Sequence, residues 1–336
     1  MKRKYIVALV LVLAGMLSYY LRPDEIFSRS GMAMNTLIRM SIKAHDDNSL
    51  NDAYTLLDSL DFSLSMFNPS SDISRINSLA GISSAHVGAD TLSLIRKAVA
   101  IHDMTDGSFN PLIGPLTRLW KINHNDSFIP SQISIDIAVN FTDINNLTLL
   151  HNNSVYLKHN GCLLDLGGIA KGFAGDAIAQ IFRNNGVKSA IIDLGGNICT
   201  VGFNFDGQLW KIGIRDPFEP FTKPALVVHV HDCSVITSGN YERFKILNGK
   251  KFSHFFDPKT GNSIMNDLLS VTVIHNDGSI ADGLATAFMI MGLNNARIYA
   301  TKLNIKTVFI RNDKTIFASE SLKHNVSDNK FQIVFF

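Results

Sequence analysis

The chain has few cysteines and almost no net charge. Its 336 residues include only three cysteines, too few and too scattered for a disulfide framework or a zinc site. The formal net charge is +2 and no stretch concentrates lysine and arginine, so we expect no nucleic-acid partner. A hydrophobic fraction of 46% with 18% charged residues is typical of a folded protein. The length allows one large domain or two packed halves.

The N-terminal segment lacks a lipidation cysteine and a clean cleavage site. Residues 2–4 are Lys-Arg-Lys and residues 5–21 are almost entirely apolar, which is the pattern of an export signal. The run is short for a membrane span, and the bulky residues 18–21 do not form a small-x-small cleavage site. We expect residues 1–29 to be an uncleaved membrane anchor or a cleaved signal peptide. Residues 30–336 would then work on the periplasmic side of a bacterial inner membrane, or free in the periplasm.

No linker divides residues 30–336, and the predicted elements do not alternate as in a parallel βαβ fold. This interleaving favours an α+β fold, with mixed β-sheets and flanking helices in two packed halves. Apolar spacing predicts helices over 49–66, 89–103, 173–182, 281–291 and 294–302. Extended segments are predicted at 31–42, 155–157, 188–193, 210–214, 226–230, 234–237, 268–274, 306–310, 315–318 and 332–336, with loops at 67–77 and 123–153.

Residues 165–172, with the sequence Asp-Leu-Gly-Gly-Ile-Ala-Lys-Gly, connect an extended segment to an amphipathic run at 173–182. Glycines let the backbone approach a ligand, the helix N-terminus favours an anion, and Lys171 adds positive charge. A phosphate site and a simple strand-to-helix connection fit this stretch equally well. Residues 193–196 repeat Asp-Leu-Gly-Gly after a predicted strand, which suggests either two glycine loops that line one pocket or a coincidence.

Several other side chains have both a chemical and a structural interpretation. Asp282 and Thr286 lie four residues apart on a predicted helix, so their oxygens share a face and offer hard ligands of the kind that Mg²⁺ takes. Without further context, Asp282 is better explained as a helix N-terminal charge that the helix dipole favours. His254 could accept a proton near neutral pH or be structural. Phe67 and Phe109 could stack on a planar ring or anchor their loops.

Five motifs follow one another along the chain: residues 165–172, 195–197 (Gly-Gly-Asn), 237–240 (Thr-Ser-Gly-Asn), 254–261 (His-Phe-Phe-Asp-Pro-Lys-Thr-Gly) and 281–287 (Ala-Asp-Gly-Leu-Ala-Thr-Ala). Each motif alone is common, but their order and spacing together are specific. In this respect the chain resembles the ApbE-type FAD:protein FMN transferases, from about residue 31 to near the C-terminus. Weaker matches lie at 34–36, 65–77, 107–110 and 114–116.

The resemblance implies a bilobed α+β fold that binds FAD between its halves. It implies Mg²⁺-dependent transfer of FMN from FAD to a threonine or serine of an exported flavoprotein, with release of AMP. Mg²⁺ would be held by the carbonyl of Gly168 and the side chains of Asp282 and Thr286, while His254 would deprotonate the acceptor hydroxyl and Lys171 would neutralise charge at the pyrophosphate. The implied FAD contacts are Met34, Phe67, Ser108, Phe109, Asn110, Asp165, Lys171 and Phe256.

The family expectation for the acceptor is an electron-transport subunit of the Rnf or Nqr type. An acceptor sequence of the Ser/Asp-Gly-Ala-Thr kind is not obvious in this chain, so we expect it to modify another protein. The sequence departs from the family pattern at Asn110, usually aspartate, and Asn35, usually glycine. Two alternatives remain: a Mg²⁺-dependent FAD pyrophosphatase that yields FMN and AMP, and a non-catalytic periplasmic FAD-binding protein. The intact set of implied catalytic and metal-site residues argues against the latter.

Overall fold

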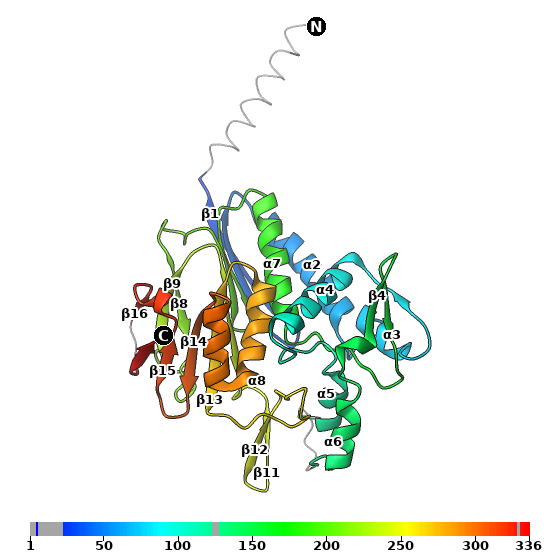
Figure 1. Cartoon of the computed structure of the whole chain (residues 1–336). Helices are drawn as coiled ribbons and strands as arrows, with labels where there is room; N and C mark the ends of the chain where they lie inside the picture. The colour runs from blue at the N-terminus through cyan, green and yellow to red at the C-terminus, as the bar shows by residue number, and fades with distance from the viewer. Residues whose placement is uncertain (1–4, 6–22, 123–127, 328–329) are drawn as a thin grey trace.

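The structure is a computed structural model that describes the chain apart from residues 1–4, 6–22, 123–127 and 328–329 (Figure 1). Most of the predicted anchor or signal, residues 1–29, therefore lies outside the described residues, and its role stays a prediction. Within the described part of the chain, none of the helices is long and apolar enough to cross a membrane.

A nine-stranded mixed sheet organises the molecule, in the order β1-β2-β6-β7-β10-β13-β14-β15-β17. All neighbouring strands pair antiparallel except β15 and β17, which are parallel. The strands are β1 (Glu25–Ala33), β2 (Thr36–Ala44), β6 (Ser189–Leu194), β7 (Asn197–Val201), β10 (Ser234–Gly239), β13 (Leu268–His275), β14 (Lys306–Arg311), β15 (Ile316–Ala318) and β17 (Ile333–Phe335).

The two faces of this sheet are covered differently. In Figure 1 the helices α7 (Ala170–Asn184) and α8 (Gly278–Lys302) lie side by side against one face. On β14, Phe309 joins the core beneath these helices, whereas Val308 and Ile310 point to a second core on the other side. That second core is shared with the three-stranded sheet β16-β9-β8, whose strands are β8 (Trp210–Ile214), β9 (Leu226–Val230) and β16 (Val326–Ser327).

A smaller part of the molecule lies beside α7 and α8 in Figure 1 and is built largely by residues 65–165. A third apolar core, around Trp120, joins two of its helices to the β11–β12 hairpin, which projects from the lower edge of the molecule. The remaining elements are α2 (Asn48–Leu64), α3 (Asp72–Ser78), α4 (Ala89–Met104), α5 (Gly114–Trp120), α6 (Gln132–Val139), β3 (Ala85–His86), β4 (Leu147–Leu150), β5 (Ser154–Leu157), β11 (Phe244–Leu247), β12 (Lys250–Ser253) and the short 3-10 helices η1 (Ile144–Asn146) and η2 (Glu320–Leu322).

The predicted α+β fold, with mixed sheets and flanking helices in two packed halves, is confirmed. Three local predictions were wrong. The extended segment at 31–42 is interrupted, because Met34 and Asn35 adopt positive φ in the β1–β2 turn. The loop at 67–77 contains most of α3, whose first turn is capped by the Ser71 hydroxyl. The region 123–153, expected to be irregular, contains α6 and β4 among its described residues.

Candidate active site

One cavity of about 440 Å³ lies between the 165–172 turn, α5, α8 and the segment that follows β10. Eleven of the twelve site residues named from the sequence line it. These are Phe67, Ser108, Phe109, Asn110, Asp165, Gly168, Lys171, His254, Phe256, Asp282 and Thr286. The fold therefore brings together residues that lie up to 219 positions apart (286 − 67) in the chain.

Met34 is the exception, since it is not among the residues that line this cavity. It occupies the turn between β1 and β2 with a φ of 49°, and its backbone N–H donates to the Asp61 carboxylate at 2.9 Å. The side chain packs against the main core. A contact between Met34 and FAD is therefore not supported by its position in the structure.

The 165–172 turn is held from both ends. The Asp165 carboxylate accepts a hydrogen bond from the Gly167 N–H at 2.9 Å and another from the Thr117 hydroxyl at 2.8 Å. At the other end, a Cβ on Gly172 would lie 2.0 Å from the Gly278 carbonyl oxygen, so only glycine lets α7 and α8 cross this closely. Lys171, in the first turn of α7, consequently has a fixed backbone position at the cavity wall.

The groups proposed for metal binding meet at the α7–α8 crossing. Asp282 is 4% exposed, and its carboxylate accepts hydrogen bonds from the Gly172 N–H at 2.9 Å and the Asn197 amide at 3.3 Å. Burial raises the pKa of Asp282, and the nearby Lys171 charge opposes that shift. One turn further along α8, the Thr286 hydroxyl donates to the Gly168 carbonyl at 3.3 Å.

This oxygen cluster contains a single carboxylate. In the described part of the chain, no three His, Cys, Asp or Glu side chains form a group that could hold a metal ion. A cation at this position would depend on Asp282 together with neutral oxygens from Gly168 and Thr286. These are hard oxygen donors, the type that Mg²⁺ prefers when a substrate phosphate and water complete its coordination.

The second glycine loop, residues 193–196, does not contribute to the lining of this cavity. Gly195 has a φ of 68°, and a Cβ there would lie 2.0 Å from the Thr36 hydroxyl. The loop instead leads into β7, whose first residue, Asn197, donates to Asp282. The expectation that two glycine loops line one pocket was wrong. The second loop lies outside the cavity lining and leads to Asn197, whose amide donates a hydrogen bond to the Asp282 carboxylate.

His254 follows β12 directly and has a defined tautomer. Its Nδ1 lies 3.0 Å from the Arg243 carbonyl oxygen, which also accepts the His254 backbone N–H at 3.2 Å. Because a carbonyl can only accept, Nδ1 carries the proton, and Nε2 keeps its lone pair. Burial, together with the nearby Arg243 and Lys171 charges, lowers the pKa of His254 to about 4. The ring is therefore neutral near physiological pH and able to accept a proton.

Three aromatic residues of the site differ in their exposure. Phe109 and Phe256 are each 3% exposed, and Phe256 stacks on Trp120 with 5.8 Å between ring centroids. Phe67 is 72% exposed at the cavity. Asn110 is buried with its amide already engaged, since it donates to the Thr142 carbonyl and accepts from the Leu112 N–H. The Asn110 side chain therefore shapes the cavity wall.

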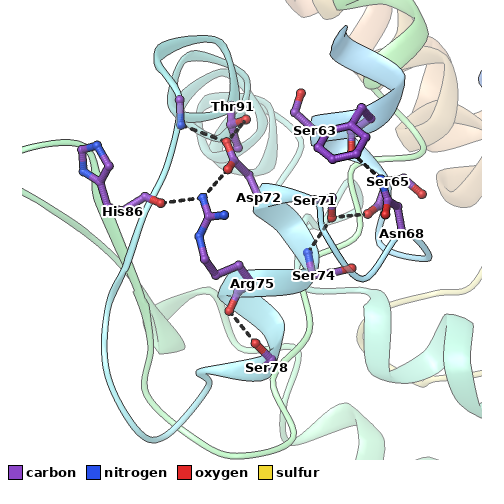
Figure 2. A network of polar contacts seen from close by, with 12 residues as sticks. Ser63, Ser65, Asn68, Ser71, Asp72, Ser74, Arg75, Ser78, His86 and Thr91 are labelled. Atoms are coloured by element: carbon purple, nitrogen blue, oxygen red, sulfur yellow. Dashed lines mark hydrogen bonds and ion pairs between the residues drawn. The ribbon is translucent and has the colours of Figure 1, made fainter. Parts of the chain in front are cut away.

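Figure 2 shows the polar network that holds the segment carrying Phe67. The Ser71 hydroxyl donates to the Ser65 carbonyl at 2.6 Å and accepts from the Ser74 N–H at 2.9 Å. Asp72 pairs with Arg75 and accepts hydrogen bonds from the Gly88 N–H and the Thr91 hydroxyl. An exposed aromatic ring thus stands on a segment fixed by side-chain hydrogen bonds.

The sequence matches a known protein family over most of its length. The model of the ApbE family matches residues 34–309, more than half of the chain.

The chain belongs to the ApbE family.

Two relatives have the name FAD:protein FMN transferase. The protein of Treponema pallidum is 32% identical over 320 residues, which cover 89% of this chain and 88% of the relative. That of Klebsiella pneumoniae is 29% identical, with 93% and 98% covered. Among solved structures, the flavin transferase ApbE of Vibrio cholerae has a TM-score of 0.81 at 27% identity and the ApbE protein of Thermotoga maritima 0.83 at 27%; each match covers 90% of this chain and 100% of the other.

Sequence reasoning missed several residues that line the cavity of this ApbE-family chain. The glycine and proline at 114–115 start α5, where proline is favoured at the first helical positions, and we did not predict this helix. The motif at 237–240 was noticed without a site residue being assigned to it. The lining residues from these two regions and the segment after β10 are Thr117, Arg118, Lys121, Thr237, Ser238, Gly239, Glu242 and Arg243.

The charges around the cavity favour a polyanion. Four cationic side chains line it, against three carboxylates. The pKa of Glu242 is raised, because burial outweighs the opposing effect of the positive charges of Lys171 and the nearby arginines. The cations are Arg118, Lys121, Lys171 and Arg243, and the carboxylates are Asp165, Glu242 and Asp282.

Proposed function

We propose that this ApbE-family chain is a FAD:protein FMN transferase, which attaches FMN through a phosphoester bond to a threonine or serine of an exported flavoprotein and releases AMP. The observation that carries the proposal is the position of His254: a neutral imidazole with a free Nε2 lines the same cavity as Lys171 and the Asp282–Thr286 group. A base for a hydroxyl and cationic groups for a phosphate are the two requirements of this transfer.

The reaction balances with the groups present. The acceptor hydroxyl oxygen forms a bond to the phosphorus of the FMN half of FAD, and the bond from that phosphorus to the bridging oxygen breaks. AMP leaves with the bridging oxygen and its electron pair. The acceptor proton passes to Nε2 of His254, and Lys171 offsets the negative charge that develops on the phosphates. Four cationic side chains at the cavity support a pyrophosphate as the bound group.

The cavity also suits a flavin in size and lining. Its volume of about 440 Å³ falls in the range of small-molecule sites. Phe109 and Phe256 provide buried apolar surface, and the exposed ring of Phe67 is available to stack on a planar ligand. We therefore propose that the isoalloxazine ring is bound among these aromatic side chains, with the pyrophosphate directed toward Lys171.

Mg²⁺ fits the residues at the α7–α8 crossing. Asp282 is a buried carboxylate, and within the described part of the chain no ion pair neutralises it. The Gly168 carbonyl and the Thr286 hydroxyl lie 3.3 Å apart and provide two further oxygens. We propose that these three groups hold Mg²⁺, which would neutralise charge on the pyrophosphate when bound.

The proposed acceptor and location rest on the family expectation and on the N-terminal pattern. We propose that the acceptor is an exported flavoprotein, with electron-transport subunits of the Rnf or Nqr type as first candidates. The apolar run at 5–21 supports a place at the inner membrane, facing the periplasm, or in the periplasm if the signal is cleaved.

The test combines the purified full-length chain, FAD, Mg²⁺ and a carrier protein that bears an Asp-Gly-Ala-Thr segment. Flavin fluorescence in a denaturing gel reports covalent attachment, and free AMP reports cleavage. We expect a fluorescent carrier band that disappears with EDTA and with threonine replaced by valine in the carrier. AMP without carrier labelling would instead identify a pyrophosphatase, and bound FAD without either product would identify a binding protein.

A further inference from the structure

The second glycine loop, residues 193–196, lies outside the cavity lining, yet its geometry is narrowly defined. Gly195 and Gly196 have φ values of 68° and 94°. Leu194 pairs with Asn197 across them, so they form a two-residue hairpin turn, in which positive φ at both positions suits glycine. The Asp193 carboxylate accepts a hydrogen bond from the Gly196 N–H at 2.7 Å. The repeated Asp-Leu-Gly-Gly sequence therefore builds the turn from which β7 starts.

This turn is packed against a neighbouring strand on one side only. A Cβ on Gly195 would lie 2.0 Å from the Thr36 hydroxyl oxygen. A Cβ on Gly196 would meet no atom of the described residues within 4 Å. Thr36 is the first residue of β2, and β2 pairs with the whole of β6. The backbone at the start of β7 is consequently fixed by the hairpin and by the contact with Thr36.

At the start of β7, Asn197 brings a neutral donor to a buried carboxylate. Asn197 is 5% exposed, and its amide nitrogen lies 3.3 Å from Oδ1 of Asp282. The other carboxylate oxygen, Oδ2, accepts the Gly172 N–H at 2.9 Å. The two donors belong to different elements, β7 and α7, so the carboxylate is held through both of its oxygens. A carboxylate has about four lone-pair sites, which leaves sites for a metal ion.

An amide suits this position better than a charged or an apolar side chain. A lysine or arginine at 197 would form an ion pair with Asp282 and compete with a metal ion for it. An apolar side chain would leave Oδ1 without its donor. Carboxylates that bind metal ions are generally hydrogen-bonded by outer partners of this kind, and these partners fix the orientation of the ligand.

We propose that Asn197 is a positioning residue: its amide, placed by the Gly195–Gly196 turn, fixes the orientation in which the Asp282 carboxylate binds Mg²⁺. This inference rests on the metal site of the proposed function. It gives a role to the second Asp-Leu-Gly-Gly sequence, whose residues do not line the cavity.

The experiment measures Mn²⁺ binding, because Mn²⁺ takes the same oxygen ligands as Mg²⁺ and the free ion has an electron paramagnetic resonance signal. The purified full-length chain is titrated with saturating FAD and no carrier, and binding to FAD alone is subtracted. Asn197→Ala should raise the dissociation constant for Mn²⁺ by about tenfold to a hundredfold, as removal of an outer partner does at other metal sites.

Thr200→Ala is the matched control. Thr200 is fully buried on the same strand, and its hydroxyl donates to the Cys233 carbonyl at 2.9 Å. The substitution thus removes a buried hydrogen bond of β7 that does not involve Asp282. We expect it to lower stability and to leave the Mn²⁺ affinity unchanged.

Two glycine variants test the turn while keeping the Asn197 side chain. Gly195→Ala and Gly196→Ala each place alanine at positive φ, but only the methyl group at 195 meets Thr36. Gly195→Ala should therefore raise the dissociation constant for Mn²⁺ about tenfold, and Gly196→Ala should change it about twofold at most. Equal constants in the two variants would contradict placement of Asn197 by the turn.

The outcomes separate this inference from the proposed function. Unchanged Mn²⁺ affinity in Asn197→Ala overturns the positioning role, and so do equal losses in Asn197→Ala and Thr200→Ala, since the effect would then follow stability alone. Absence of Mn²⁺ binding by the unaltered chain would remove the proposed metal site and this inference together. Mn²⁺ binding that depends on Asn197, without labelling of the carrier, would support the positioning role and remove the transferase proposal.

Discussion

The two sides of the candidate site are built in opposite ways. The Asp282 side lies at the crossing of α7 and α8, where close backbone contact and two hydrogen bonds fix a buried carboxylate. The His254 side stands at the base of a two-stranded hairpin, half-buried and anchored by one carbonyl. The first side holds charge that must stay in place, and the second has to admit a second substrate. In the proposed reaction FAD would occupy the interior, and the acceptor hydroxyl would approach from the side of His254.

The largest expected effect comes from removing the interior charge. Asp282→Asn should lower the transfer rate about 10³-fold, because the proposed metal would lose its only carboxylate. Since burial raises the pKa of Asp282, the buried carboxylate costs folding free energy that a neutral amide would not, so the substitution should leave the free energy of unfolding unchanged or increase it. Rates as a function of Mg²⁺ concentration and denaturant unfolding measure the two effects.

Asp176→Asn is the control for that variant. The Asp176 carboxylate sits at the same helix crossing, but it accepts hydrogen bonds from the Gly278 and Ser279 N–H groups and does not line the cavity. Burial raises the pKa of Asp176 as well, so here too we expect the free energy of unfolding to stay unchanged or rise, with little effect on the rate per folded molecule. If both variants kept their rate, the assignment of Asp282 to metal binding would be wrong.

On the hairpin side, His254→Ala should lower transfer about 10²-fold while leaving the affinity for FAD and the stability close to those of the unaltered chain. The pH dependence sharpens this prediction. A base with a pKa lowered to about 4 stays unprotonated above that value, so kcat/KM should remain constant through pH 6.5 and fall only as the pH approaches 4. A profile that falls with a midpoint near 6.5 would contradict the buried, neutral imidazole.

The same lowered pKa has a consequence for stability. Between pH 6.5 and about 4 the unfolded chain binds a proton at His254 that the folded chain does not, so this residue favours unfolding as the pH falls through that window. Its destabilising contribution is absent above pH 6.5. The His254→Ala variant should therefore lose less stability than the unaltered chain between pH 6.5 and 4, as measured by thermal unfolding at a series of pH values.

The helix crossing itself can be broken without touching a polar group. Gly172→Ala places a methyl group 2.0 Å from the Gly278 carbonyl, which should cost about 3 kcal/mol of folding free energy and displace Asp282 from its N–H donor. Gly175→Ala is the control, because a Cβ there meets its nearest neighbour, Cys199, at 3.4 Å. We expect Gly175→Ala to keep or raise stability in denaturant unfolding, as alanine does in a helix. Equal losses in both variants would contradict the crossing argument.

The sequence predicted the interior side better than the hairpin side. Residues 165–172 and the Asp282–Thr286 pair carry their geometry in local spacing: a glycine turn before a helix, and two oxygens one turn apart. The full set of twelve site residues came from the family resemblance, and eleven of them line one cavity. Met34 is not among the lining residues. It lies in the turn between β1 and β2, and the pattern of apolar residues did not predict that turn.

Contacts between residues far apart in the chain could not be predicted from the spacing of residues in the sequence. The tautomer of His254 depends on the carbonyl of Arg243, eleven residues earlier and across a hairpin that we did not predict. The role of Asn197 behind Asp282 required the pairing of β6 with β7. Short helices were also missed, since seven residues of α3 or α5 contain too few apolar positions to define a period.

The smallest expected effect concerns the segment that carries Phe67. Ser71→Ala removes the N-cap of α3 and the hydrogen bond to the Ser65 carbonyl, which should cost about 1 kcal/mol of folding free energy. Because Phe67 is exposed and fixed only through its segment, we also expect the affinity for FAD to fall about fivefold. Ser131→Ala removes the equivalent cap of α6, whose residues do not line the cavity, and should cost similar stability with unchanged FAD affinity. Equal FAD affinities in the two variants would show that Phe67 needs no fixed segment to bind the flavin.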